Sequence, residues 1–143
     1  MSRATRDRSF FAVLFSKKCE YAIRALVFLA RRPEVKGAQE ISQSESVPYH
    51  FIAKILQELK AKGFVRSVRG NRGGFQLARP ASSVRLMDVL KAIDGEQALV
   101  KCLYGLEECS DSDPCPLHDG WKDLRGRIEQ YLTHHTLDDL AAQ

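Results

Sequence analysis

The segment from Phe64 to Arg79 restricts the fold of this chain most strongly. It contains two short β-prone stretches, FVRSV and GFQLAR, which are joined by the glycine-rich turn RGNRGG. Such a pattern predicts a β-hairpin, and the glycines let its tip turn sharply and approach another surface closely. Because arginines lie along the hairpin, we expect it to contact a polyanion. The positions predicted to contact DNA are Arg66, Arg69, Asn71 and Arg72, and Arg79 also lies on the hairpin.

Three helical segments are expected before the hairpin. From residue 16 onward, apolar residues recur at helical spacing, and Pro33 ends this first segment. The second, GAQEISQS, has enough apolar residues for about two turns. The third, SVPYHFIAKILQELKAKGF, has Ser46 as its expected N-cap, Pro48 in its first turn and Gly63 as its stop.

Helices in this order, followed by a basic hairpin, are typical of a winged helix-turn-helix domain. We therefore predict a mainly α fold with a small β-hairpin wing. The third helix is expected in the major groove of DNA, with the hairpin against the backbone or the minor groove. A glycine-rich loop can also bind a nucleotide phosphate, but the chain lacks the strand–loop–helix context and the glycine pattern of such a site.

The third helix has an apolar face and a polar face. The residues predicted to be buried are Ile52, Ile55, Leu56 and Leu59. His50, Lys54 and Gln57 fall on the opposite face, where imidazole and amide groups can bond base edges and an ammonium can meet phosphate. Tyr49 and Ser16 are expected to add phosphate contacts. For an isolated helix, an ordinary solvent-facing surface is the alternative interpretation.

Two further helices are expected after the hairpin. The first ends at Gly95, and its apolar face consists of Leu86, Val89, Leu90 and Ile93. The second carries a heptad seam made of Leu117, Trp121, Leu124, Ile128 and Tyr131. This seam can pack against the chain's own core or against the same helix of a second chain. Thr136 and Asp139 then predict a short capped turn near the C-terminus.

A cluster of thiols interrupts these helices. Cys102, Cys109 and Cys115 lie close together in the sequence, and His118 follows. Thiolates bind zinc, copper(I) or iron–sulfur clusters, but the closely spaced cysteine pairs of a zinc finger are missing here. The wide gaps suit a larger object such as a cluster, although spacing alone leaves zinc and unligated surface thiols open. Cys19, by contrast, lies on an apolar helical stripe and is expected to be a buried structural thiol.

Charge divides the chain into two parts. Residues 1–100 carry 18 Lys or Arg against 9 Asp or Glu, a net +9, and residues 101–143 carry 4 against 9, a net −5. The basic front suggests that residues 1–100 meet a polyanion, and the acidic thiol segment is expected to lie away from DNA. A solvated surface with uneven charge is the alternative interpretation.

The length of 143 residues suits one domain. No apolar run is long enough for a membrane helix, and the N-terminus lacks a secretory pattern, so we expect a cytoplasmic protein. Disulfides are rare in the cytosol, so the thiols suggest metal binding or redox chemistry. No catalytic constellation is recognisable, and we predict that the protein is not an enzyme.

Several motifs together resemble a known family. They are SKKCEYAIRAL, VPYHFIAKILQELKAKGFVRSVRGNRGGFQLARP, VLKAIDG, CPLHDGWKDLRGRIEQYL and TLDDL. The chain is similar, from about Val13 to Leu140, to the IscR-type iron–sulfur-cluster regulators of bacteria, winged-helix transcription factors that include the nitric-oxide-sensing NsrR-type members. The RGNRGGFQLAR wing with three cysteines downstream is the most specific part of this resemblance. The first twelve residues are an addition to the family pattern.

This resemblance implies a homodimer with crossed C-terminal helices and a 2Fe–2S or 4Fe–4S cluster held by Cys102, Cys109 and Cys115. The fourth ligand in IscR-type members is a histidine three residues after the third cysteine, which is His118 here. In NsrR-type members it is a carboxylate of the other subunit, and Glu20 occupies that place. The local CPLH match favours the histidine. The first gap between cysteines is one residue longer than in the founding pattern, which leaves the cluster type open.

The predicted function is a DNA-binding regulator whose affinity for a palindromic operator depends on the cluster. The cluster would sense redox, iron or nitric oxide status. Two other interpretations are an iron–sulfur carrier or scaffold without specific DNA binding, and a DNA-binding regulator with structural zinc. The expected parts are an N-terminal extension, a DNA-binding domain, a cluster-binding loop, and a dimerisation helix with a tail. They cover residues 1–13, 14–95, 96–118 and 119–143.

Overall fold

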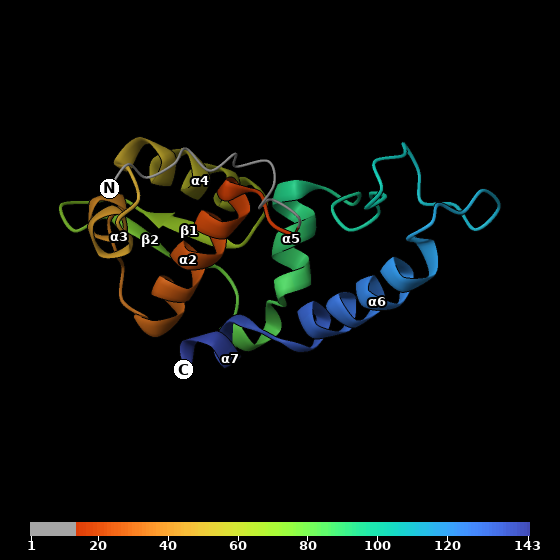
Figure 1. The fold of residues 1–143 in the computed structure, drawn as a ribbon. Helices are drawn as coiled ribbons and strands as arrows, with labels where there is room; N and C mark the ends of the chain where they lie inside the picture. Colours follow the sequence, from red (N-terminus) through yellow and green to blue (C-terminus); the bar gives the residue numbers. More distant parts are fainter. Residues whose placement is uncertain (1–13) are drawn as a thin grey trace, which may run out of the picture.

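Helices make up most of the part of the chain that this computed structural model describes, residues 14–143, and a two-stranded antiparallel hairpin accompanies them (Figure 1). The expected N-terminal extension lies outside the described residues. In chain order the elements are α2 (Lys17–Arg31), α3 (Ala38–Glu45), α4 (Tyr49–Ala61), β1 (Val65–Val68), β2 (Gly74–Leu77), η1 (Ala81–Ser83), α5 (Leu86–Asp94), α6 (His118–His134) and α7 (Leu137–Ala141). The predicted mainly α fold with a small hairpin is confirmed.

Helix α2 begins and ends where the sequence predicts. The Ser16 hydroxyl accepts a hydrogen bond from the Cys19 backbone N–H at 3.0 Å and so caps the helix, which ends at Arg31 before Pro33. Cys19 is fully buried in the stripe, as predicted. Burial, together with the nearby carboxylate of Asp94, raises the pKa of the Cys19 thiol to about 12, so this sulfur stays protonated and unreactive.

The corner between α3 and α4 differs from the prediction. Ser46 does not cap α4; it adopts the left-handed conformation, with φ 53° and ψ 43°, and ends α3. Pro48 is the N-cap of α4 and therefore precedes the first turn. The reason is the tight packing of the corner, where Val47 is buried and the Ser42 hydroxyl donates to its carbonyl at 2.6 Å. The three linking residues thus turn the chain, as a helix-turn-helix requires.

The other end of α4 follows the expected pattern. Gly63 has φ 80°, and its N–H donates to the Lys60 carbonyl at 3.1 Å. The N–H of Phe64 reaches back to the Leu59 carbonyl at 2.9 Å. Together these bonds form a Schellman cap, in which buried Phe64 and Leu59 accompany the turn. The cap directs the chain straight into β1.

The hairpin is joined by backbone hydrogen bonds to the link between α2 and α3. β1 and β2 pair with Val65 opposite Leu77 and Val68 opposite Gly74. Lys36, in the link between α2 and α3, exchanges two backbone hydrogen bonds with Phe75, at 3.0 and 2.8 Å. This bridge gives the two-stranded sheet a third backbone partner and sets the angle at which the wing leaves the domain.

One hydrophobic core joins α2, α4, α5 and α7. The predicted apolar faces of α4 and α5 are buried in it. The largest fully buried side chains include Leu26, Leu29, Ile41, Ile52, Leu56, Leu59, Leu90 and Leu137. Burying such side chains is the main favourable contribution to folding, at about 1.5–3 kcal/mol each.

Helix α6 projects from this core and returns to it through α7. A β-bridge pairs Arg85 with Thr136, because the Leu86 N–H donates to the His135 carbonyl and the Leu137 N–H donates to the Val84 carbonyl, each at 2.9 Å. Thr136 then caps α7 with Asp139, as predicted. The chain from 96 to 117 lies at the far end of α6, opposite the hairpin tip (Figure 1).

A membrane helix is not part of this fold. Within residues 14–143, no helix combines the length and the apolar character needed to cross a bilayer.

Candidate nucleic-acid interface and metal centre

Within residues 14–143, no other element covers the outer face of α4. His50, Lys54 and Gln57 are all exposed, opposite the buried stripe. Tyr49 is 52% exposed, and Phe51, which the sequence analysis did not single out, is 47% exposed beside the His50 ring. The helix therefore presents polar, cationic and apolar groups together, which is the mixture that base edges and thymine methyl groups require.

Two of the wing arginines contact neighbouring side chains, and two are exposed at the tip of the hairpin. Arg66 donates to the Gln76 side-chain oxygen at 3.0 and 3.2 Å, and the Arg79 guanidinium lies 4.5 Å from the centre of the Phe64 ring. Arg69 and Arg72 are exposed at the tip, with Asn71 between them. The tip thus offers two cations and an amide, while the arginines nearer the domain are held in place by neighbours.

Ser16 has a different role from the predicted phosphate contact. Its hydroxyl caps α2 and donates to one oxygen of Asp94, while its backbone N–H donates to the other at 2.8 Å. The hydroxyl and the backbone N–H of Ser16 therefore both donate to Asp94, and these hydrogen bonds join the start of α2 to the end of α5.

The thiols of the loop lie in two donor pairs. The Cys102 and Cys115 sulfur atoms are 3.7 Å apart. The Cys109 sulfur lies 3.5 Å from Nδ1 of His118, a ring that is only 5% exposed. Residues separated by up to 16 positions in the sequence, from Cys102 to His118, are thus brought together at the start of α6.

An outer carboxylate holds the histidine. His118 Nε2 lies 2.7 Å from Oδ1 of Asp111, which also accepts from the Lys122 ammonium at 2.9 Å. The hydrogen bond with the imidazole has the larger effect and that with the ammonium the smaller, and both hold the pKa of Asp111 below its usual range. Nδ1 therefore points at Cys109, in the orientation that a carboxylate typically gives a metal-binding imidazole.

The two sulfurs of the first pair differ in acidity. Burial raises the pKa of Cys102, but the backbone N–H groups of Leu106 and Tyr104 outweigh it and leave the thiol more acidic than usual. Burial also raises the pKa of Cys115, and the neighbouring sulfurs Cys102 and Cys109 raise it further. Cys102 is therefore the thiol of this pair that ionises first.

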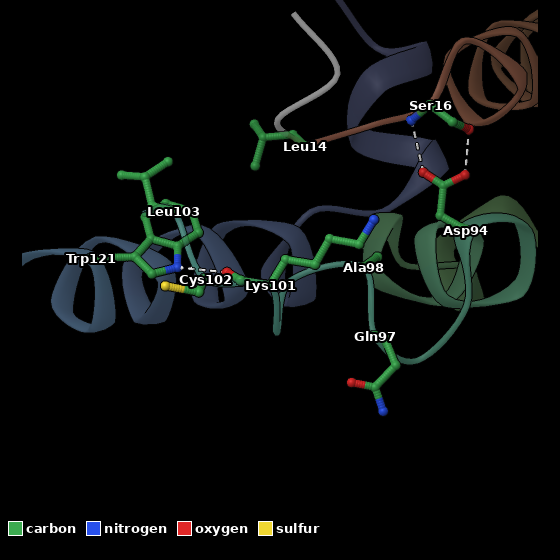
Figure 2. A pocket seen from close by; sticks show the side chains of 9 residues that line it. All are labelled: Leu14, Ser16, Asp94, Gln97, Ala98, Lys101, Cys102, Leu103 and Trp121. Carbon is green, nitrogen blue, oxygen red and sulfur yellow. Dashed lines mark hydrogen bonds between the residues drawn. The ribbon is translucent and has the colours of Figure 1, made fainter. Parts of the chain in front are cut away.

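A pocket of about 430 Å³ lies between the start of α2 and this loop. Figure 2 shows Ser16 bonded to Asp94 on one side, and on the other the Trp121 indole donating to the Lys101 carbonyl at 3.0 Å. Cys102 lies beside the indole (Figure 2). The first donor pair is therefore anchored to α6, and only this pocket separates it from the Ser16–Asp94 contact.

The heptad seam of α6 is divided between two environments. Trp121 is 7% exposed and Ile128 packs against the chain's own core. Leu117, Leu124 and Tyr131 are 45%, 51% and 58% exposed along the neighbouring edge of the helix. One side of the predicted seam thus faces α5, and the other side is an apolar edge that no element within residues 14–143 buries.

Comparison with known proteins identifies the chain. The model of the Rrf2 family, described as an iron-dependent transcriptional regulator, matches residues 15–143. The chain belongs to the Rrf2 family.

Several relatives of this Rrf2 chain are transcription regulators. A protein of Aquifex aeolicus, predicted to be an HTH-type transcriptional regulator, is 32% identical and covers 90% of this chain and 91% of its own. The HTH-type transcriptional regulator IscR of Pectobacterium atrosepticum is 30% identical over 87% of this chain and 77% of its own. CymR, the global cysteine regulator of B. subtilis, has a similar structure, with TM-score 0.75 and 24% identity over 90% of this chain and 95% of its own.

These similarities confirm the resemblance to IscR-type regulators and the winged-helix fold. The Rrf2 chain is a transcription regulator that binds DNA, and its relatives are regulators rather than enzymes. The cluster, the dimer and the site residues remain predictions.

Each donor pair of this Rrf2 chain has the spacing of two ligands on one tetrahedral metal. In a tetrahedral site with metal–sulfur bonds of about 2.3 Å, two thiolates lie about 3.7–3.8 Å apart, and a thiolate and an imidazole nitrogen lie about 3.5–3.6 Å apart. The distances of 3.7 Å for Cys102–Cys115 and 3.5 Å for Cys109–His118 match these spacings. Within the described residues, no three His, Cys, Asp or Glu side chains converge on a single point.

Glu20, the other candidate for the fourth ligand, lies in the first turn of α2. Its carboxylate pairs with the Lys17 ammonium at 3.0 Å. It belongs to neither donor pair, so it is a candidate only for a second copy's site.

Proposed function

We propose that this Rrf2 regulator is a homodimer whose affinity for a palindromic operator depends on a 2Fe–2S cluster in each chain. The observation that carries this proposal is the pairing of four donors at the spacings of two tetrahedral irons. Cys102 and Cys115 are assigned to one iron, and Cys109 and His118 to the other. A 2Fe–2S cluster takes two protein ligands per iron, so it suits these pairs better than a 4Fe–4S cluster does. Bound there, the cluster would respond to redox, iron or nitric oxide status.

The DNA-binding surface follows from the exposed groups. Helix α4 is assigned to the major groove, where His50 and Gln57 read base edges and Lys54 and Tyr49 contact the backbone. Arg69, Asn71 and Arg72 at the wing tip meet phosphates, with Arg66 held behind them. The net positive charge of residues 1–100 supports this placement.

The second copy is expected along α6. The exposed apolar residues Leu117, Leu124 and Tyr131 recur every seven positions along one edge of α6, so the same edge of a second copy can pack on them across a two-fold axis. A two-fold dimer presents two α4 helices to two half-sites, so its operator is expected to be palindromic.

The loop that carries the donor pairs lies between the winged domain and the proposed dimerisation helix α6. It joins α5 to α6, and α5 ends at Asp94, whose carboxylate bonds Ser16 at the start of α2. Reordering of the loop would change how α6 sits on the winged domain and thus the spacing of the two reading helices. Because half-sites lie about one helical turn apart, a small change in that spacing costs affinity.

The ligand assignment predicts the effect of two substitutions. His118→Ala removes a donor, and Asp111→Asn removes the carboxylate that orients the imidazole. We expect Asp111→Asn to lower iron retention against a chelator by about 10–100-fold, with His118→Ala lower still. Iron and sulfide counts on anaerobically prepared protein, with visible absorption, measure this. Glu20→Gln is the matched control and is expected to retain iron like the unchanged chain.

The same measurements separate the alternatives. Two irons and two sulfides per chain support a 2Fe–2S cluster, whereas zinc leaves the protein colourless. A carrier without specific DNA binding would bind random and palindromic duplexes equally at every salt concentration. If Glu20→Gln lost iron and His118→Ala retained it fully, the fourth ligand would be Glu20 of a second copy rather than His118.

The DNA interface makes a separate prediction. Lys54→Ala and Arg69→Ala each remove a proposed phosphate contact, so each should weaken all duplexes alike and lower the slope of log affinity against log salt by about 0.9 per lost contact. Gln57→Ala should instead change the sequence preference and leave the slope unchanged. A salt titration with two duplexes measures both effects. An unchanged slope in both cation variants would exclude these residues from the interface.

A further inference from the structure

Two thiols of the loop are close enough to bond to each other. The sulfurs of Cys102 and Cys115 lie 3.7 Å apart as free thiols, whereas a disulfide requires about 2.05 Å. A shift of less than about 2 Å therefore joins them. We propose that, when no cluster is bound, Cys102 and Cys115 form a reversible disulfide that excludes Cys109.

The start of α6 holds this pair together. The Trp121 indole donates to the Lys101 carbonyl at 3.0 Å, next to Cys102, and the His118 N–H donates to the Cys115 carbonyl, also at 3.0 Å. Both cysteines are thus anchored to the first turn of one helix, although thirteen positions separate them. The chain between them carries no helix or strand, and residues 103–108 are exposed, so little packing opposes the small shift.

Cys109 has a different neighbour. Cys109 lies in the loop between Cys102 and Cys115, and its sulfur faces Nδ1 of His118 at 3.5 Å. An imidazole cannot complete a disulfide, so the geometry selects one pairing out of the three that these thiols allow.

Hydrogen peroxide is an oxidant that this arrangement suits. Oxidation of a thiol depends on access to its sulfur as well as on its acidity. Cys115 is partly exposed, whereas Cys102 is only 9% exposed, so access makes Cys115 the thiol that peroxide meets first. The Cys115 sulfur attacks one peroxide oxygen, the O–O bond breaks, and a sulfenic acid and water form. The Cys102 sulfur then attacks the Cys115 sulfur, the S–O bond breaks, and a second water leaves. Two thiols are oxidised by two electrons, and one peroxide is reduced to two waters.

The consequence for regulation rests on the proposed function. The disulfide joins the two sulfurs assigned to one iron, so the oxidised chain should not regain a cluster until a thiol reductant opens the bond. The disulfide itself requires only the geometry of the cluster-free chain.

Peptide mapping tests the pairing directly. Cluster-free protein would be treated with hydrogen peroxide, alkylated, and digested with trypsin and a protease that cleaves after Glu and Asp. These cuts place the cysteines in residues 102–107, 109–111 and 112–119. The expected result is a link between the first and third peptides, lost on reduction, with Cys109 alkylated or oxidised alone. A predominant link to the Cys109 peptide, or no link at all, would overturn the proposal.

Two variants test the order of events. Cys102→Ala should accumulate a sulfenic acid on Cys115 that dimedone traps, because the second thiol is missing. Cys109→Ala is the matched control and should form the link as the unchanged chain does. Failure of Cys109→Ala to link would also refute the pairing. If the link forms in a protein that never takes up iron and sulfide, the proposed cluster falls while this inference stands.

Discussion

A Gly74→Ala substitution is expected to detach the wing and abolish specific DNA binding while the helical core stays folded. A Cβ on Gly74 would lie 2.4 Å from the Lys36 carbonyl oxygen and 2.8 Å from the Gly37 nitrogen. Both are backbone atoms, so the new methyl group must separate the bridge between Lys36 and Phe75. Overpacking of this kind costs about 1–3 kcal/mol or more, and it acts on the backbone bridge that joins the wing to the link between α2 and α3.

Gly126→Ala is the control for that prediction. Gly126 lies within α6, and a Cβ there meets nothing within 4 Å. Alanine in a helix interior is favoured over glycine by about 0.5–1 kcal/mol, so this variant should be slightly more stable than the unchanged chain. Thermal unfolding and a salt-titrated duplex assay measure the two variants together. Normal duplex binding by Gly74→Ala would show that the wing does not depend on its bridge to Lys36.

Much of the fold could be predicted because its signals are local. The stripes of α2, α4 and α5 are set by residues three or four positions apart, and Gly63 and Gly95 mark the ends of two of these helices. The wing is similarly local, since its glycines and β-prone residues are adjacent in the sequence. The Ser46 error arose where tertiary packing decided the outcome, because buried Val47 shortened the corner.

The contacts that couple the parts could not be predicted from one sequence. The bridge between Arg85 and Thr136 and the bonds from Ser16 to Asp94 join residues 51 and 78 positions apart, and no periodicity signals them. The same holds for α7, which packs against α2 as part of the core.

The candidate metal centre was predicted in composition but not in arrangement. Thiols and a histidine in a short segment indicate a soft metal, and that much is local. The pairing of Cys109 with His118, and the use of Asp111 as the partner of the imidazole, depend on how an irregular loop folds onto α6. Asp111 could have been suspected only from the general rule that a metal-binding imidazole has a carboxylate behind it.

A Leu124→Asp chain is expected to be a monomer that binds its operator about 10²–10⁴-fold more weakly. Leu124 is half-exposed in the single chain and lies in the middle of the apolar edge of α6, between Leu117 and Tyr131. A second copy packed on this edge would bury a carboxylate with no partner, which a dimer does not tolerate. Without the dimer each half-site is bound separately, so the advantage of linked binding is lost. Sedimentation and duplex titration at the same protein concentration measure both effects.

Gln130→Asp supplies the matched charge on the same helix. Gln130 is exposed, and at about 100° per residue it lies roughly 120° around the helix from Leu124. It adds one carboxylate as Leu124→Asp does, yet it should leave the dimer and its operator affinity unchanged. Because Leu124 is not in the core, both variants should keep the helical content of the unchanged chain. A Leu124→Asp protein that remains dimeric would place the second copy on another surface, and the palindromic arrangement of the two α4 helices would then need a different axis.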